Sequence, residues 1–561
     1  VKAFERHLHP SIYKRIIKTN KLLQENLNPD KFRAEGGLDL DTYSALQERW
    51  QDQEERIQGI KQEYKAKYGS LKNIPSSIGR CRKIEMVGTK NALVLLIEFD
   101  DIKHTAIYDD NYFKDLLFSK GKQSMRDYFL EASWNQLDIK GEVSDGWYTA
   151  AHNRAEYLDK YPVKGSYPKA QNLVKEAIIQ AKNSNKFDFT HFANDDGKID
   201  MLLVVFAGSG FDTKLNINYI RPHQDKLIEP IEVQEGIWVD RYSMNPELPA
   251  DDLGCFCHEM GHLLGLPDLY KEGYSPVVGS WCLMAVGCYN NNSRTPAHPS
   301  AWCKIHLGWT KPKLVEKNLQ TYEIPEIIRE KEIYKLEVEG SQGKEYFLLE
   351  NRQQKGFDKY LPGSGLLIWH VDEGVCVPQA PNSDPNHFFL TLKQSDGKED
   401  LQSDRTELFK NQMLEKLPKD IEGDLGDPFP GITLNRTFND ESHPNSRSYK
   451  GKKSFIEVFS ISDSEDVMTA KMGIQKISHG NNIQFNFSDA AAEPKKETTK
   501  NFTPLQFIIC NYPAQPKGPY QQGKEDYFED IKKEIGLEDF QDGYRRGYLH
   551  GYQEAVKKAK K

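Results

Sequence analysis

The stretch His258-Glu259-Met260-Gly261-His262-Leu263-Leu264-Gly265-Leu266-Pro267-Asp268 decides how the rest of the chain is interpreted. Residues four apart on an α-helix lie on the same face, so this spacing predicts that His258 and His262 offer two imidazole nitrogens to one metal ion. Glu259 lies off that face, where its carboxylate can reach a metal-bound water without occupying the metal. Glu259 is therefore the candidate general base.

A catalytic zinc site needs a third protein ligand and one open position. Gly265 tolerates the left-handed backbone that ends a helix, and Pro267 cannot continue one, so we expect a sharp turn directly after His262. Asp268 follows at once and can fold back under the metal. We predict that His258, His262 and Asp268 are zinc ligands and that the fourth position stays open.

A later segment, Gly279-Ser280-Trp281-Cys282-Leu283-Met284, is a candidate Met-turn, with Met284 beneath the metal. The alternative is that a histidine pair on a leucine-rich helix is simply packed and hydrogen-bonded, because HExxH alone also arises by chance. The added glycine and aspartate have metzincin-like spacing, and together with the candidate Met-turn they favour zinc.

Composition bounds the class of protein. The 561 residues give room for two to four domains, with 38% hydrophobic and 28% charged residues and no apolar run near the length of a membrane span. The net charge of -8 and the lack of a basic stripe predict neither a nucleic-acid partner nor a membrane surface. The chain begins with Val1 and has no leader pattern, so we expect a processed chain or one that was never exported.

Residues 1–82 contain two sets of apolar residues at helical spacing, separated by Gly36 and Gly37, and we predict a helical hairpin. This N-terminal segment is either an inhibitory pro-segment or a structural brace. In a latent zymogen, Cys81 is a candidate thiolate cap on the zinc.

Residues 83–312 are predicted to form an α+β catalytic domain of the zincin type. Continuous apolar runs at Ala92–Phe99 and Met201–Phe206 indicate strands buried on both faces of a twisted sheet. The apolar face of the helix around residues 173–181 is suited to backing that sheet. The HExxH helix completes the layout.

Three further segments follow the catalytic domain. Residues 313–487 are rich in short strand-like runs broken by turn residues and are expected to form a β-rich domain, and residues 488–500 have the composition of a linker. Residues 501–561 form a small helical segment in which glycine–tyrosine pairs recur every four residues from Gly543. On a helix these glycines would form a groove of small residues beside a stripe of tyrosines. The groove is a candidate site for a partner helix or for self-association; the alternative is a helix packed on its own protein.

Asp195, Asp196 and Asp200 surround a glycine turn just before the second apolar run. Carboxylates are the oxygen ligands that calcium prefers, so the turn is a candidate calcium site. The alternative is a solvated acidic turn.

Several separated motifs resemble the immune inhibitor A family of zinc metallopeptidases: HEMGHLLGLPDLY, GSWCLMAVG, PSAWCKIHLGW, YFLLENRQQKGFDKYLPGSGLLIWHVDE, GDPFP and PNS. They fall in the same order as in that family, between about residues 88 and 473. The resemblance implies zinc, often structural calcium, a pro-segment, secretion, and endopeptidase action on proteins. It matches His258, His262 and Asp268 to the zinc ligands, Glu259 to the base and Met284 to the turn.

We therefore expect peptide-bond hydrolysis of protein or peptide substrates, in which Glu259 assists attack by a zinc-bound water. The rival from another class is a catalytically silent binding or structural module that uses its helical arms and C-terminal repeat. Such a module would show a broken base or ligand, and every one is present. Hydrolysis of a non-peptide amide stays open, and an extracellular location is expected with an intracellular one left open.

Overall fold

Two apolar runs of the sequence form neighbouring strands of one sheet. Strand β1 (Gly88–Glu98) pairs in parallel with β5 (Leu202–Ser209), with Leu93 beside Leu202. Leu93 and Leu95 point to one core, whereas Val94 and Leu96 point to another on the opposite face. Both faces of the sheet are therefore covered, as a continuous apolar run predicts.

The computed structural model describes residues 85–158, 167–210, 220–248, 252–270, 277–315, 319–375, 381–382, 384, 386–402 and 422–475. All of them belong to one compact unit. The predicted N-terminal hairpin with Cys81, the linker and the C-terminal segment lie outside the described residues. The proposed division into domains stays a prediction.

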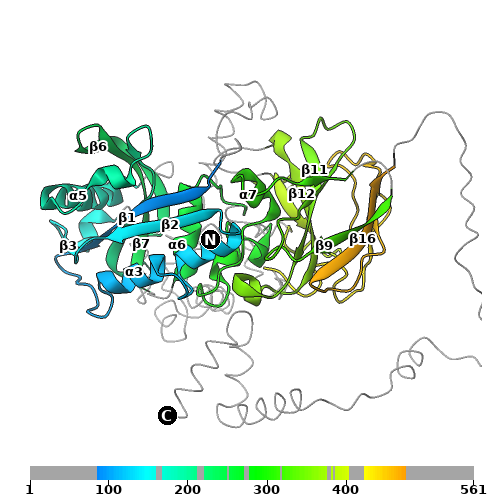
Figure 1. Cartoon of the computed structure of the whole chain (residues 1–561), viewed down its shortest axis with the longest axis horizontal. Coiled ribbons are helices and arrows are strands. Elements are labelled where there is room, and N and C mark those ends of the chain that lie inside the picture. Colours follow the sequence, from blue (N-terminus) through cyan, green and yellow to red (C-terminus); the bar gives the residue numbers. More distant parts are fainter. Residues whose placement is uncertain are drawn as a thin grey trace, which may run out of the picture. The chain divides into compact units, whose positions relative to one another are not determined.

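The first sheet has seven strands in the order β2-β1-β5-β7-β4, with β3 beside β1 and β6 beside β7 (Figure 1). Every pair is parallel except β6 with β7, which is an antiparallel hairpin. The remaining bounds are β2 (Leu137–Val143), β3 (Tyr148–Thr149), β4 (Lys198–Ile199), β6 (His223–Gln234) and β7 (Ile237–Leu248).

Helices cover both faces of this sheet. Helix α5 (Pro168–Ser184) packs Leu173, Val174 and Ala177 against one face. The opposite face carries α3 (Asp110–Phe118), α4 (Met125–Ala132) and α6 (Leu253–Leu263). Sheet and helices together confirm the α+β class.

Residues 313–475 add two more sheets. One has the order β13-β12-β11-β10-β8 and the other β14-β15-β16-β9. Their bounds are β8 (Lys313–Leu314), β9 (Gln320–Pro325), β10 (Tyr334–Glu337), β11 (Glu345–Arg352), β12 (Gly365–Asp372), β13 (Leu390–Lys393), β14 (Thr437–Asn439), β15 (Ile456–Phe459) and β16 (Val467–Ile474).

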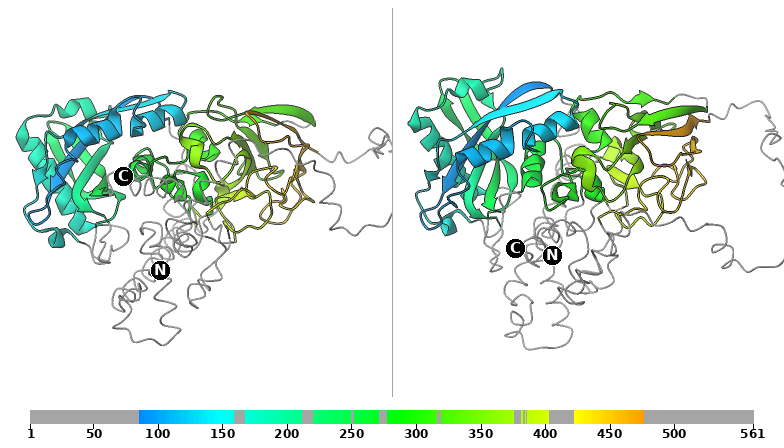
Figure 2. Two further views of the ribbon diagram at one scale, coloured as in Figure 1. Left: turned by 90° about the horizontal axis from the view of Figure 1, so that it is seen from below. Right: turned by 60° about the horizontal axis from the view of Figure 1, so that its bottom comes forward.

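Every residue of β11 and β12 is buried, because the five-stranded sheet has a layer on each side. Phe347 and Leu349 of β11 face the four-stranded sheet, whereas Tyr346 and Leu348 join the core that also contains α6. Short helix α7 (Ala301–His306) lies between the two parts of the molecule and packs on β11 (Figures 1 and 2). One hydrophobic core therefore runs from the first sheet into the β-rich part.

The described residues also form six short 3-10 helices: η3 (Arg154–Tyr157), η5 (Phe189–Phe192), η6 (Gly279–Trp281), η7 (Val286–Tyr289), η8 (Gly356–Tyr360) and η9 (Glu373–Val375). None of the described helices has both the length and the apolar character of a bilayer span.

Candidate metal centre

Helix α6 carries the HExxH motif and has defined ends. The side chain of Asp252 accepts a hydrogen bond from the amide of Cys255 and so caps the helix N-terminus. At the other end Gly265 has φ +102°, and the amide of Leu266 returns to the carbonyl of Gly261 at 2.9 Å. The helix stops there, which brings Asp268 back toward the histidines.

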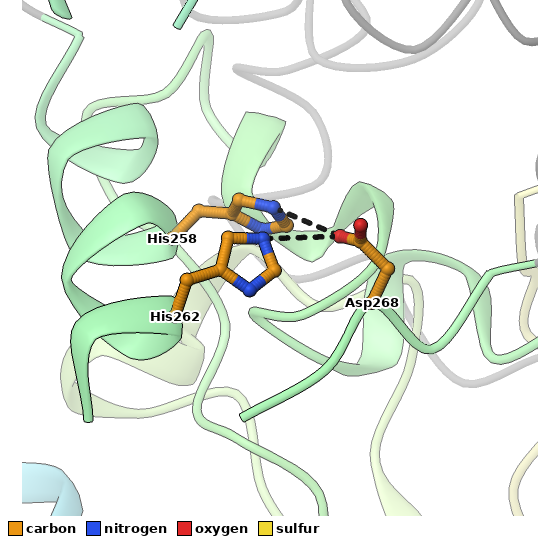
Figure 3. A group of neighbouring side chains, drawn as sticks. All are labelled: His258, His262 and Asp268. Carbon is orange, nitrogen blue, oxygen red and sulfur yellow. Dashed lines mark ion pairs between the residues drawn. The ribbon is translucent and has the colours of Figure 1, made fainter. Parts of the chain in front are cut away.

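His258, His262 and Asp268 converge on one point (Figure 3). The Nε2 atom of His258 lies 3.2 Å from Oδ1 of Asp268, and the Nε2 atom of His262 lies 3.3 Å from the same oxygen. The two imidazole planes are nearly perpendicular, at 87°. Both histidine side chains are less than a tenth exposed, and that of Asp268 is about a third exposed.

Backbone carbonyls hold the outer nitrogens of both rings. Nδ1 of His258 is 2.9 Å from the carbonyl oxygen of Leu283, and Nδ1 of His262 is 2.8 Å from that of Leu266. A carbonyl oxygen only accepts, so each Nδ1 carries a hydrogen, and Nε2 is the ring nitrogen that is left to bind a metal at the common point. This is the tautomer that a metal-binding histidine needs.

Opposite charges in this group shift both pKa values strongly. Burial by itself would lower the pKa of His258, but the hydrogen bond to Asp268 helps to outweigh burial and raises that pKa well above its usual value. Burial would likewise raise the pKa of Asp268, but the neighbouring imidazoles hold it well below its usual value. Both shifts reflect the attraction between the carboxylate and the neighbouring imidazoles.

The spacing of the donor atoms fits a small tetrahedral cation. Bonds of about 2.0 Å at tetrahedral angles place two ligand atoms about 3.3 Å apart, as expected for zinc held by histidine and carboxylate. The two measured nitrogen–oxygen distances are 3.2 and 3.3 Å. Among the residues that the structure describes, this is the one group of three or more histidine, cysteine or acidic side chains close enough to share a metal.

Comparison with known proteins agrees with this geometry. Residues 82–314 match the family described as immune inhibitor A peptidase M6, catalytic domain. This domain belongs to the immune inhibitor A peptidase family. The match contains the whole of the first sheet, α6 and the segment around Met284.

Two relatives show how far the similarity extends. The chain is 29% identical over 274 residues to the pre-pro-metalloprotease PrtV of Vibrio cholerae serotype O1, which covers 39% of this chain and 30% of that protein. It is 26% identical over 252 residues to immune inhibitor A of Bacillus thuringiensis subsp. alesti, which covers 35% of this chain and 36% of that protein. The chain thus spans about a third of the length of these relatives.

Met284 packs directly against α6 in this immune inhibitor A peptidase domain. A Cβ atom placed on Gly261, between the two histidines, would lie 2.5 Å from Sδ of Met284. Cys282 and Leu283, the two residues before Met284, belong to the same hydrophobic core. Glycine at 261 is therefore needed for the close approach of the methionine.

Glu259 follows His258 on α6 and is 2% exposed. One residue along a helix turns a side chain by about 100°, which separates Glu259 from the face that bears the two histidines. Its role as general base stays a prediction.

The acidic turn does not form a comparable group. Asp200 accepts a hydrogen bond from the side chain of Asn194 at 2.6 Å and lies 3.9 Å from Arg241. The side chain of Asn194 in turn accepts from the amide of Asp196. Asp195, Asp196 and Asp200 are not brought together as ligands within the described part of the chain. Calcium at this turn stays a prediction.

Sequence reasoning missed the carbonyl groups of Leu283 and Leu266, which orient the two rings. No signal in the sequence could have found them, because every residue carries the same backbone carbonyl. It also missed a cluster of buried charged residues behind the Met284 segment. That cluster is visible in the sequence only as charged residues inside otherwise apolar runs.

Proposed function

We propose that the chain is a zinc-dependent endopeptidase with a zincin-type catalytic domain. The observation that carries the proposal is the convergence of two Nε2 atoms on one carboxylate oxygen at 3.2 and 3.3 Å, with both outer nitrogens bonded to carbonyls. The family of the domain and the metalloprotease among its relatives support the same activity.

His258, His262 and Asp268 would hold the zinc. When bound, zinc supplies a Lewis acid that polarises a substrate carbonyl and lowers the pKa of water. The three residues provide two neutral nitrogens and one negative oxygen, which leaves a net positive charge beside the scissile bond. The open side of this set is where a substrate carbonyl would lie.

Glu259 would take the proton from the attacking water and deliver it to the leaving nitrogen. Its burial keeps bulk water from competing for the carboxylate.

The test compares Glu259→Gln with the unmodified full chain on casein, with and without a chelator. We expect Glu259→Gln to keep its zinc and lose about 100- to 10,000-fold in kcat, as for loss of a general base. The control is Glu345→Gln, which removes another buried carboxylate bonded to a histidine. Undiminished cleavage by Glu259→Gln would refute the base, and zinc binding without cleavage by the unmodified chain would favour the binding module.

A chain that begins at residue 83 tests the proposed pro-segment in the same assay. We expect it to cleave casein faster than the full chain if residues 1–82 inhibit. Equal rates would assign those residues to a structural role. The proposed secretion has a separate test: we expect the protein in the culture medium of its host, and recovery in the cell fraction alone would contradict it.

A further inference from the structure

A cluster of charged side chains lies buried between the first sheet and the β-rich part. Lys304, Glu350, Arg352 and Asp358 each have fully buried side chains. Removing four charges from water costs free energy that their mutual attraction offsets only when the geometry is good. The positions of their hydrogen bonds indicate what the cluster does.

Glu350 and Arg352 lie on the face of β11 that joins the core containing α6. Successive side chains of a strand alternate between faces, so both residues share the face of Tyr346 and Leu348. Those two side chains belong to the core that contains α6. Residues from the β-rich part therefore enter the environment of the metal-binding helix.

Arg352 and Asp358 form a two-point ion pair. Nε of Arg352 donates to Oδ2 of Asp358 at 2.7 Å, and Nη2 donates to Oδ1 at 2.5 Å. Burial would raise the pKa of Asp358, but the charge of Arg352 outweighs burial and lowers that pKa to about 2. The pair is therefore ionised and rigid at neutral pH.

This ion pair binds the backbone on both sides of the Met284 segment. Nη1 of Arg352 donates to the carbonyl of Trp281 at 3.3 Å, and Oδ1 of Asp358 accepts from the amide of His298 at 2.9 Å. The carbonyl of His298 in turn accepts from the amide of Leu283 at 3.3 Å. One guanidinium–carboxylate pair thus holds the backbone at both ends of the loop formed by residues 281–298.

Leu283 completes the connection, because its carbonyl holds Nδ1 of His258 at 2.9 Å. The direction of that carbonyl determines which way the imidazole faces. Arg352 holds the carbonyl of Trp281, two residues before Leu283, and Asp358 holds the amide of His298, whose carbonyl bonds the amide of Leu283. These contacts fix the peptide planes on both sides of Leu283.

We propose that Arg352 is a positioning residue for the metal centre: paired with Asp358, it fixes the loop whose Leu283 carbonyl orients the His258 imidazole. The β-rich part thereby completes the zinc site without touching the metal. This inference rests on the proposed function.

The experiment measures zinc affinity of the full-length Arg352→Lys protein by competition with a chromophoric chelator. Lysine keeps the charge but cannot bond Asp358 at two points and Trp281 as well. We expect about tenfold weaker zinc binding, as for other residues that orient metal ligands. The absorption spectrum of the Co2+-loaded protein should also change, because it reports ligand geometry.

Arg126→Lys is the matched control. Arg126 makes the same two-point pair with Asp138, at 2.6 and 2.9 Å, but joins α4 to β2 and makes none of the contacts to the Met284 segment described above. We expect its zinc affinity and its Co2+ spectrum to match those of the unmodified protein. A loss of affinity equal to that of Arg352→Lys would overturn the inference, because it would reflect general destabilisation.

A second variant tests the proposal if Arg352→Lys does not fold. Arg352→Met with Asp358→Asn removes both charges, keeps an oxygen for the amide of His298 and leaves Lys304 paired with Glu350 at 3.3 Å. We expect it to bind zinc at least tenfold more weakly. Zinc affinity equal to that of the unmodified protein in a folded variant would overturn the positioning role. Absence of zinc binding by the unmodified protein would instead overturn the proposed function.

Discussion

The amide of Leu269 donates a hydrogen bond of 2.8 Å to the carbonyl of Met284. This bond joins the residue after Asp268 to the methionine that packs under α6. The preceding carbonyl, that of Leu283, holds His258. The carbonyls of Leu283 and Met284, two consecutive residues, therefore contact His258 and the residue after Asp268. The loop that contains them sets the distance between these two candidate ligands.

Replacing Asp268 with alanine should weaken zinc binding by more than about 100-fold, because loss of a ligand costs more than loss of the residues that orient ligands. The measurement is chelator competition on the folded protein. Asp196→Ala serves as the control, since that carboxylate lies in the acidic turn and should leave zinc affinity unchanged. Equal affinity in Asp268→Ala and the unmodified protein would remove Asp268 from the ligand set.

Gly261→Ala should destabilise the protein by about 1 to 3 kcal/mol, because the added methyl group would meet the sulfur of Met284 at 2.5 Å. Met284→Ala should also destabilise, through the cavity that it leaves. The double variant should be more stable than the sum of the two losses predicts, by about 1 kcal/mol. Urea unfolding of the four proteins measures this coupling, and strict additivity would show that the two side chains do not compete for space.

Gly254→Ala should be more damaging, at about 3 kcal/mol or more, because the new methyl would lie 1.8 Å from the carbonyl oxygen of Cys288 and a backbone atom cannot move aside. The matched control is Gly363→Ala. Its methyl would meet its nearest neighbour at 3.4 Å, an ordinary contact. Thermal unfolding should separate the two variants, and similar melting temperatures would contradict the packing of α6 on η7.

Asp427 should make stability fall as the pH rises through neutrality. Burial raises its pKa to about 7, despite hydrogen bonds from Gln394 and Trp281 that favour the ionised form. A folded-state pKa above the unfolded value means that the stabilisation is fully present below about pH 4 and is lost as the pH rises through 7. The largest slope for one such group is about 1.4 kcal/mol per pH unit.

Asp427→Asn should flatten that dependence between pH 5 and 8, measured by urea unfolding at each pH. Asp145→Asn is the control, because the carboxylate of Asp145 is exposed and its pKa is lowered by Lys186. It should leave the slope in this range unchanged. An equally steep decline in Asp427→Asn would assign the pH dependence to other groups.

Much of the first sheet was predictable because its chemistry is local. Apart from Glu98, the runs Ala92–Phe99 and Met201–Phe206 contain no polar residue that could face water, so burial on both faces followed. Strands β11 and β12 were expected from short alternating runs, yet both are buried throughout. The second layer that covers them comes from distant parts of the chain, and no short stretch reveals it.

The sequence by itself determined that His258 and His262 share a helix face and that Gly265 and Pro267 end that helix before Asp268. Those properties follow from the period of the helix and the backbone preferences of two residue types. Only the tertiary structure decided which carbonyls orient the imidazoles and that Arg352 supports the loop which supplies one of them. Backbone carbonyls are identical at every residue, and Arg352 bonds the carbonyl of Trp281, which lies 71 positions away in the chain, so these partners are chosen by the packing of the folded chain.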